Sequence, residues 1–228
     1  MMKVDCYVAS ITRAEVPITT PIFKLGGNPV FVSHIEQPIC QHCGQKMDFI
    51  GQIRLDAPLP LSDRYQIAYI FMCPGQYDER GWLECPTFTP LSGANVVLLQ
   101  VDSGLALVPE TAARCPDYLM TFTPAQEPDV DISDFDLNED LYMQVAETSK
   151  IGGVPAWIQN NETPSCPHCG KSMRFVAQID AALDGPLPVD TTQWERYHFL
   201  DFGDVGIGYV FICPDDCSPT GAFLWQCT

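Results

Sequence analysis

The sequence predicts a mainly β protein of the α+β class, an internal duplication of two antiparallel β units that each carry a zinc-ribbon-like site of four cysteines. Three observations predict this fold. A motif that contains a Cys-x-x-Cys-Gly knuckle occurs twice, short β-rich runs are bounded by Pro and Gly, and no long segment keeps a helical period. Apolar residues make up 46% of the chain, enough for a packed core.

The repeat becomes visible when the chain is shifted by 126 residues. Lys24–Ile53 then aligns with Lys150–Ile179 without a gap, and 14 of the 30 positions are identical. Ordinary residue frequencies would give roughly two identities by chance. The alignment predicts a first repeat at residues 1–102, an acidic connecting segment at 103–148 and a second repeat at 149–228.

The predicted elements follow the same order in both repeats. A Gly-Gly pair, followed two residues later by Pro, predicts a tight turn that leads into an extended segment. Strands are then predicted at "MDFIGQI" and "MRFVAQI", at "YQIAYIFMC" and "GIGYVFIC", and at "NVVLLQV" and "AFLWQC". The best helical candidate is residues 138–149 of the connecting segment, with Asn138 as its N-cap.

Eight of the eleven cysteines have spacings that predict two metal sites. In each knuckle the two thiolates can share one ion, glycine tolerates a positive φ, and backbone N–H groups can point at the sulfurs. Zinc takes four ligands, so each knuckle needs a second pair of cysteines. The predicted ligands are Cys40, Cys43, Cys73 and Cys85 in the first repeat and Cys166, Cys169, Cys213 and Cys217 in the second.

The spacing leaves the fourth ligand of each site open. Cys85 corresponds either to Cys217 across a longer loop or to Cys227, which is the alternative ligand of the second site. A closed site of four cysteines favours structural Zn²⁺, with iron as the less favoured metal. His42 and His168 lie inside the knuckles, and we expect neither to be a ligand because four cysteines suffice.

Composition limits the class of partner and the compartment. The net charge of −17 argues against nucleic acid and against anionic membranes as partners. No apolar run reaches the ~20 residues of a membrane span, and "MMKVDCYVAS" lacks the apolar centre of a signal peptide. A cytoplasmic protein is therefore expected, in which cysteines serve as metal ligands before disulfides, and Cys6 and Cys115 are buried thiols.

The connecting segment contains seven acidic residues within "QEPDVDISDFDLNED", residues 126–140, with apolar residues between them. One interpretation is a solvated connector. The other is a surface that accepts a basic protein or peptide, because acidic surfaces attract cationic partners and speed their encounter. On the second interpretation the candidate partner-binding residues are Asp129, Asp131, Asp134 and Asp136.

No catalytic constellation is apparent in the sequence. It contains no phosphate-binding glycine loop, no GxSxG elbow and no HExxH helix, so we expect a protein that is not an enzyme. The alternative is a hydrolase or transferase with a cleft between the repeats, which a perturbed carboxylate or histidine would indicate. Four glutamines recur at apolar strand positions and are expected to form buried hydrogen bonds to neighbouring strands or loops, with contact to a peptide backbone as the alternative: Gln52, Gln100, Gln178 and Gln226.

Four segments of the chain resemble the YwqG-like bacterial family of unknown function: "KIGGVPAW", "CPHCGKSMRFVAQID", "GDVGIGYVFICPDDC" and "FLWQC". They are also similar to the eukaryotic programmed-cell-death-protein-two family, whose N-terminal half the first repeat resembles. The resemblance spans 19–100 and 149–228. It implies a duplicated β protein that binds other proteins, either as a chaperone for a basic ribosomal protein or as an immunity factor. The extra zinc finger of many eukaryotic members is missing, because 103–148 contains only Cys115 and no histidine.

Overall fold

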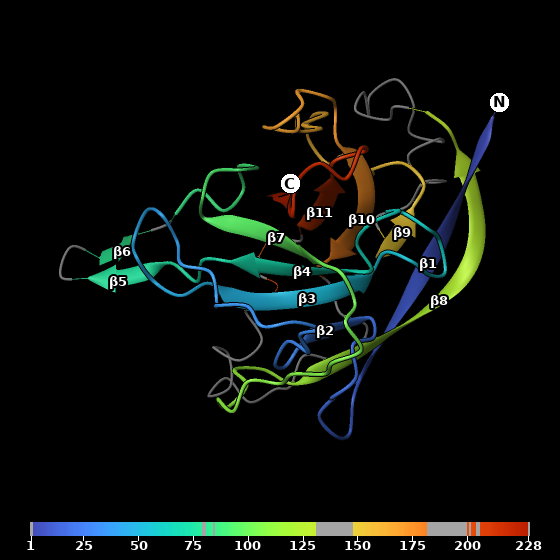
Figure 1. Cartoon of the computed structure of the whole chain (residues 1–228). Coiled ribbons are helices and arrows are strands. Elements are labelled where there is room, and N and C mark those ends of the chain that lie inside the picture. Colours follow the sequence, from blue (N-terminus) through green and yellow to red (C-terminus); the bar gives the residue numbers. More distant parts are fainter. Residues whose placement is uncertain are drawn as a thin grey trace.

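Ten antiparallel strands close into one barrel (Figure 1). The computed structural model describes residues 2–78, 81–83, 85–130, 148–181, 200, 202–203 and 206–227. Around the barrel the strands are β1 (Lys3–Arg13), β8 (Asp117–Pro128), β2 (Lys24–Gly26), β3 (Asp48–Arg54), β4 (Ile67–Met72), β7 (Asn95–Gln100), β12 (Thr220–Gln226), β11 (Ile207–Ile212), β10 (Arg174–Asp180) and β9 (Lys150–Gly152).

A small hairpin of β5 (Gln76–Asp78) and β6 (Gly81–Leu83) projects from the barrel (Figure 1). The mainly β class predicted from the sequence is confirmed. None of the described residues lies in an α-helix, and all but the last two residues of the helical candidate 138–149 fall outside them. Over the part of the chain that is described, no helix could cross a membrane.

Strands that match in sequence occupy corresponding places in the barrel. β2, β3, β4 and β7 follow one another in one direction, and β9, β10, β11 and β12 follow one another in the other, so that β7 meets β12. The irregularity in register between β3 and β4 falls at Phe49/Gly51, and that between β10 and β11 falls at Phe175/Ala177. These positions are 126 residues apart, the spacing of the sequence repeat.

The central strands are apolar along their whole length because both of their faces are covered. All six residues of β4 are buried, as are all six of β11. Ala68 and Val210 pack into the barrel interior. On the outer face Tyr69 belongs to a second apolar cluster and Tyr209 to a third. Each outer cluster also contains cysteines of one predicted metal site, so the cysteines extend the hydrophobic layer outside the barrel.

The barrel is closed by β1 and β8, which pair over eleven residues from Lys3–Pro128 to Arg13–Tyr118. β1 also pairs with β9, and β8 also pairs with β2, so this ribbon joins the two matched sets of strands. β8 lies within the predicted connecting segment 103–148. The first part of that segment therefore supplies a barrel strand, which the sequence pattern did not reveal.

Candidate metal centres

Two groups of four thiols lie on the outside of the barrel. Within each group every sulfur lies within 4.8 Å of the others. A tetrahedral zinc site with Zn–S bonds of ~2.3 Å has S···S edges of about 3.8 Å. The separations between sulfurs include 3.4 Å for Cys43–Cys73 and 3.6 Å for Cys169–Cys213. These separations suit four ligands around one cation and are far longer than the ~2.05 Å of a disulfide.

The groups contain the eight predicted cysteines. The first consists of Cys40, Cys43, Cys73 and Cys85, and the second of Cys166, Cys169, Cys213 and Cys217. The structure therefore selects Cys217 for the second group. Cys227 lies instead against Gly203, where its sulfur would be 2.8 Å from an added Cβ. Neither knuckle histidine belongs to a group, and the His42 ring contacts the Ser92 carbonyl oxygen at 2.9 Å.

Local backbone geometry prepares each knuckle for negative charge. Gly44 and Gly170, which follow the Cys-x-x-Cys pairs, have φ values of 73° and 72°. An added Cβ would meet nothing within 4 Å at either position, so the positive φ and not lack of space favours glycine. Backbone N–H groups donate to sulfur, as from His42 to Cys40 (3.4 Å) and from Asp215 to Cys213 (3.4 Å).

Each group has one thiol that ionises easily. Burial opposes ionisation of Cys40, but hydrogen bonds from the Cys43 and His42 amides outweigh it and bring the pKa to about 7. Cys213 likewise has a pKa of about 7, because the Cys217 amide and its neighbours outweigh burial. Burial raises the pKa of Cys85 to about 12. A bound cation lowers the cost of further thiolates, so these residues fit a divalent metal.

The two groups differ in exposure. In the first group Cys40, Cys73 and Cys85 are buried, and Cys43 is half-buried. In the second, Cys169 and Cys217 are exposed. Solvent and chelators therefore reach two sulfurs of the second group directly, whereas hydrophobic side chains cover the first. Cys6 and Cys115 are buried away from both groups, and burial raises the pKa of each thiol to about 11.

The recurring glutamines fasten the segments that precede the knuckles. The Gln52 side chain accepts from the Val30 N–H (2.9 Å) and donates to the Ile22 carbonyl (2.8 Å). The Gln178 side chain accepts from the Ala156 N–H (3.0 Å) and donates to Thr148 (2.9 Å). Gln100 and Gln226 make equivalent bonds to residues 32–33 and 159–160. The predicted structural role of all four is confirmed.

Two buried ion pairs escaped the sequence prediction. Lys24, which is 0% exposed, is paired with Asp117, and its Nζ donates to the Asn28 carbonyl at 2.6 Å. Lys150, which is 1% exposed, donates to both carboxylate oxygens of Glu127 at 2.8 and 2.6 Å. Burial lowers the pKa of both lysines. Both acids lie on β8, and the match of two lysines between the repeats was the available signal.

The acidic segment is described only at its start. Asp129 is exposed and follows β8, but Asp131, Asp134 and Asp136 fall outside the described residues. Glu127, one of the seven acids in the segment, is buried with Lys150 and does not belong to an acidic surface.

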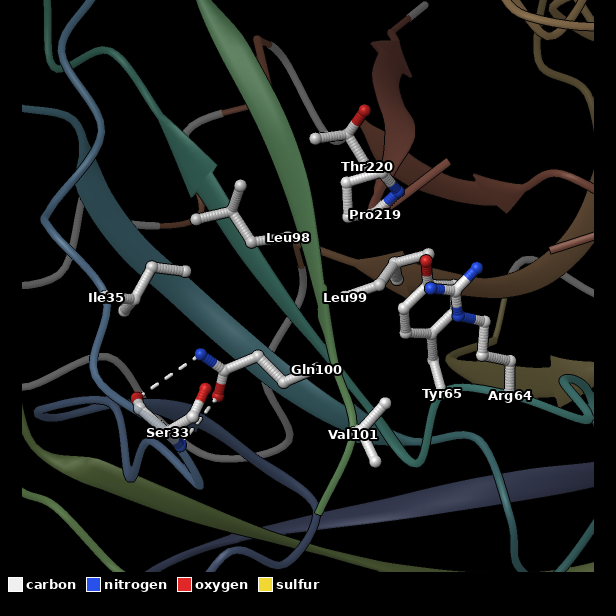
Figure 2. A pocket seen from close by; sticks show the side chains of 10 residues that line it. All are labelled: Ser33, Ile35, Arg64, Tyr65, Leu98, Leu99, Gln100, Val101, Pro219 and Thr220. Atoms are coloured by element: carbon white, nitrogen blue, oxygen red, sulfur yellow. Dashed lines mark hydrogen bonds between the residues drawn. The ribbon is translucent and has the colours of Figure 1, made fainter. Parts of the chain in front are cut away.

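A cavity of about 470 Å³ lies at the seam where β7 meets β12 (Figure 2). Its walls combine apolar side chains with a few polar ones, and the Arg64 guanidinium lies 5.2 Å from the centre of the Tyr65 ring. No carboxylate or imidazole is among its described lining residues. Its lining residues include Ile35, Arg64, Leu98, Leu99, Val101 and Pro219.

The fold and the two thiol groups define a class, a closed-barrel β protein with two four-cysteine centres suited to metal ions. No family model matches the chain. Over 78 residues, which make up 34% of this chain, the sequence is 36% identical to the uncharacterized protein YpfL of Salmonella typhimurium strain LT2. The match covers only 15% of that protein's length, and its name assigns no activity.

Proposed function

We propose that this protein is a non-enzymatic protein-binding module that recognises a basic partner and is stabilised by two structural zinc ions. The metal part rests on the convergence of eight thiols into two groups with sulfurs within 4.8 Å of each other. Four thiolates leave no coordination position for a substrate, so such a site acts in folding. Iron is the alternative metal. A reducing compartment such as the cytoplasm suits two sites of this kind.

The corresponding order of the strands supports a further part of the proposal, that the chain is an internal duplication of one zinc-ribbon-like β unit. The placement of two sequence-matched strand sets, each with one cysteine group, is the observation that favours it. The resemblance to the YwqG-like and programmed-cell-death-protein-two families is part of the same proposal, and it favours a chaperone-like or immunity-type role.

The proposal of a basic partner rests on the net charge of the chain. With 29 acidic and 12 basic side chains the chain attracts cationic proteins and repels nucleic acid. The alternative enzyme, a hydrolase or transferase, would need an acid, base or nucleophile in a cleft between the repeats. The described lining of the seam cavity supplies a guanidinium, a phenol and small hydroxyls. Binding is therefore the better supported function.

The experiment is to isolate the partner from the source cell by cross-linking to the tagged full chain, and then to measure association at several salt concentrations. We expect a basic protein whose association rate falls as salt rises. A variant with Asn at Asp129, Asp131, Asp134 and Asp136 should associate more slowly, with its zinc content unchanged.

A matched variant carries the same change of net charge at exposed acids elsewhere, with Gln at Glu15, Glu36, Glu110 and Glu162. It should slow association less if the segment itself is the recognition surface. An acidic partner contradicts the proposal, and equal effects of the two variants assign the attraction to overall charge alone.

A further inference from the structure

The seam cavity lies where the ladder between β7 and β12 ends, among the residues that the structure describes. β12 pairs with β7 at Thr220–Leu98 and Gly221–Val97, and the ladder ends where the Leu99 N–H donates to the Pro219 carbonyl at 2.8 Å. Pro219 has no N–H, so it returns no hydrogen bond to the Leu99 carbonyl. Alternate residues of an antiparallel strand direct their backbone groups to the same side. Val101, which is 53% exposed, therefore directs its backbone N–H and C=O to the same side of the strand as Leu99.

Apolar side chains flank this edge on both faces of the strand. Leu98 packs toward the outer cluster and Leu99 toward the barrel interior, as expected for successive strand residues. Figure 2 shows them with β7 running between Ile35 on one side and the Arg64–Tyr65 segment on the other. The arrangement offers backbone hydrogen bonds together with an apolar seat, the two elements by which a sheet edge binds an extended peptide.

Arg64 contributes one positive charge to the lining of the cavity. Arg64 is exposed and stacks on Tyr65, and none of the described lining residues is acidic. Guanidinium groups bind carboxylates through paired, charge-assisted hydrogen bonds, so the charge here complements a carboxylate on the occupant.

At the matching place on β12, beside Trp225, the corresponding space is filled by the chain's own Phe88. Trp225 matches Leu99 after the shift of 126, and its Nε1 donates to the Thr87 hydroxyl at 3.1 Å. The Phe88 ring packs against Trp225 with ring centroids 5.9 Å apart. Thr87 and Phe88 belong to the nine residues, 86–94, between Cys85 and β7, whereas only residues 218–219 separate Cys217 from β12. The shorter loop leaves open at β7 the space that an aromatic side chain fills at β12.

We propose that this cavity is a docking site for an extended peptide segment of a protein partner, which lies along β7 beyond the end of its described ladder with β12, seats an aromatic side chain beside Leu98 and Leu99, and places a carboxylate against Arg64. The inference goes beyond the proposed function, because it names a site and a ligand chemistry that do not require the partner to be basic overall.

The second cysteine group holds one wall of this site. Asp216 lies between the ligands Cys213 and Cys217, and its Oδ2 accepts from the amides of Asp63 (2.9 Å) and Arg64 (3.2 Å). Pro219 follows Cys217 by two residues. Asp216 is therefore a positioning residue, which fixes the segment bearing Arg64 relative to the cysteine group.

The test selects binders to the purified full chain from a displayed library of random twelve-residue peptides. We expect enriched peptides to share an aromatic residue next to Asp or Glu, and to shift the methyl NMR signals of Ile35, Leu98 and Leu99. Arg64→Gln should weaken their binding about tenfold or more, because a charge-assisted pair is lost. The matched control Arg13→Gln, an exposed charge at the end of β1, should change it less than about twofold.

A second variant examines the wall. Asp216→Gly suits the φ of 50° at this position and removes the carboxylate acceptor. It should weaken binding about fivefold without loss of metal, since the Arg64 segment is no longer held. Failure to enrich any peptide, or binding that Arg64→Gln leaves intact, overturns the site. Enrichment of Lys- and Arg-rich peptides that bind Arg64→Gln equally well would support the basic partner and overturn the docking site.

Discussion

A single buried charge, that of Lys150, has a large effect on the stability of the folded protein. Its amine is enclosed and is held by both oxygens of Glu127, which also accepts from the Val154 amide at 2.6 Å. Gly153 has no room for a side chain there, because an added Cβ would lie 1.9 Å from the same carboxylate. The Gly-Gly turn of the second repeat is thus built around this acid, and the sequence alone showed only the turn.

Glu127→Gln should lower the free energy of unfolding by about 3–5 kcal/mol, because it leaves the Lys150 charge buried without its partner. The exposed matched change, Glu110→Gln, should stay within about 0.5 kcal/mol. Denaturant titration at neutral pH measures both. Equal small effects would mean that water or another group satisfies Lys150.

The same variant should respond to pH in a definite direction. Burial lowers the pKa of Lys150 in the folded protein, and loss of Glu127 removes a contact that raises it. Between that lowered pKa and the ordinary Lys value of about 10.4 the unfolded chain binds more protons, so stability rises with pH. Relative to wild type, Glu127→Gln should therefore recover stability as the pH is raised toward 10. A difference that stays constant with pH would contradict a charged, buried Lys150.

The spacing of the cysteines predicted two thiol groups from the sequence, but it left the fourth ligand of the second group open. Two Cys-x-x-Cys-Gly knuckles predict paired thiols because the geometry is local. Whether Cys217 or Cys227 completes the second group depends on where β12 runs, which only the folded barrel fixes. Asp216 and the acids that face Lys24 and Lys150 are contacts between distant segments, and nothing in their local sequence marks them.

Cys166→Ser should remove one zinc equivalent and lower stability by several kcal/mol, because a structural zinc contributes on the order of 10 kcal/mol of binding free energy. Cys115→Ser is the control, since it changes a buried thiol outside both groups and should cost about 1–3 kcal/mol with metal content unchanged. Metal analysis combined with thermal unfolding separates the two. Equal losses of stability in the two variants, without loss of metal, would contradict a structural role of the site.

At the scale of elements, the barrel depends on side-chain hydrogen bonds as well as on strand ladders. The segments after each Gly-Gly turn are extended but make few ladder contacts, and buried glutamines on β3, β7, β10 and β12 hold them. The alternating and fully apolar runs predicted six of the barrel strands. β1 and β8 were missed because burial does not alternate along them, as the buried Cys6 and Ile11 of β1 are five residues apart, and because β8 contains Pro124. β2 and β9 have three residues each, too few for a periodic pattern.

Gln178→Met keeps the side-chain length but leaves the Ala156 amide and the Thr148 carbonyl without these partners. The expected loss is about 2–4 kcal/mol, because buried backbone groups are costly when unpaired. Gln45→Met, at an exposed position, should change stability by less than about 0.5 kcal/mol. Hydrogen exchange at the Ala156 amide should accelerate only in the first variant. Unchanged exchange would show that another group takes over the bond.

At the scale of the whole molecule, closure makes the two matched halves interdependent. β7 pairs with β12 and β1 pairs with β9, so strands of each predicted repeat complete the sheet of the other. The common interior combines residues from both, including Leu25, Val97, Val210 and Phe223. The repeat in the sequence could predict two similar units, but joining them in one barrel depends on β1 and β8, which have no counterpart in the aligned motif.

The two metal centres should nevertheless be distinguishable in the intact molecule. Two sulfurs of the second group are exposed and the first group is mostly buried, so a chelator reaches the second ion without any opening of the barrel, whereas the first ion requires local unfolding. Addition of excess chelator to the zinc-loaded protein should release about one equivalent quickly and the other at least tenfold more slowly, as followed with a zinc-sensitive dye.

Cys166→Ser should abolish the fast phase and leave the slow one. Because Asp216 links the second group to the Arg64 segment, the methyl signals of Leu98 and Leu99 should shift with the fast phase and not with the slow one. Release of both ions in a single phase, or loss of the slow phase in Cys166→Ser, would show that exposure of the cysteines does not set the order.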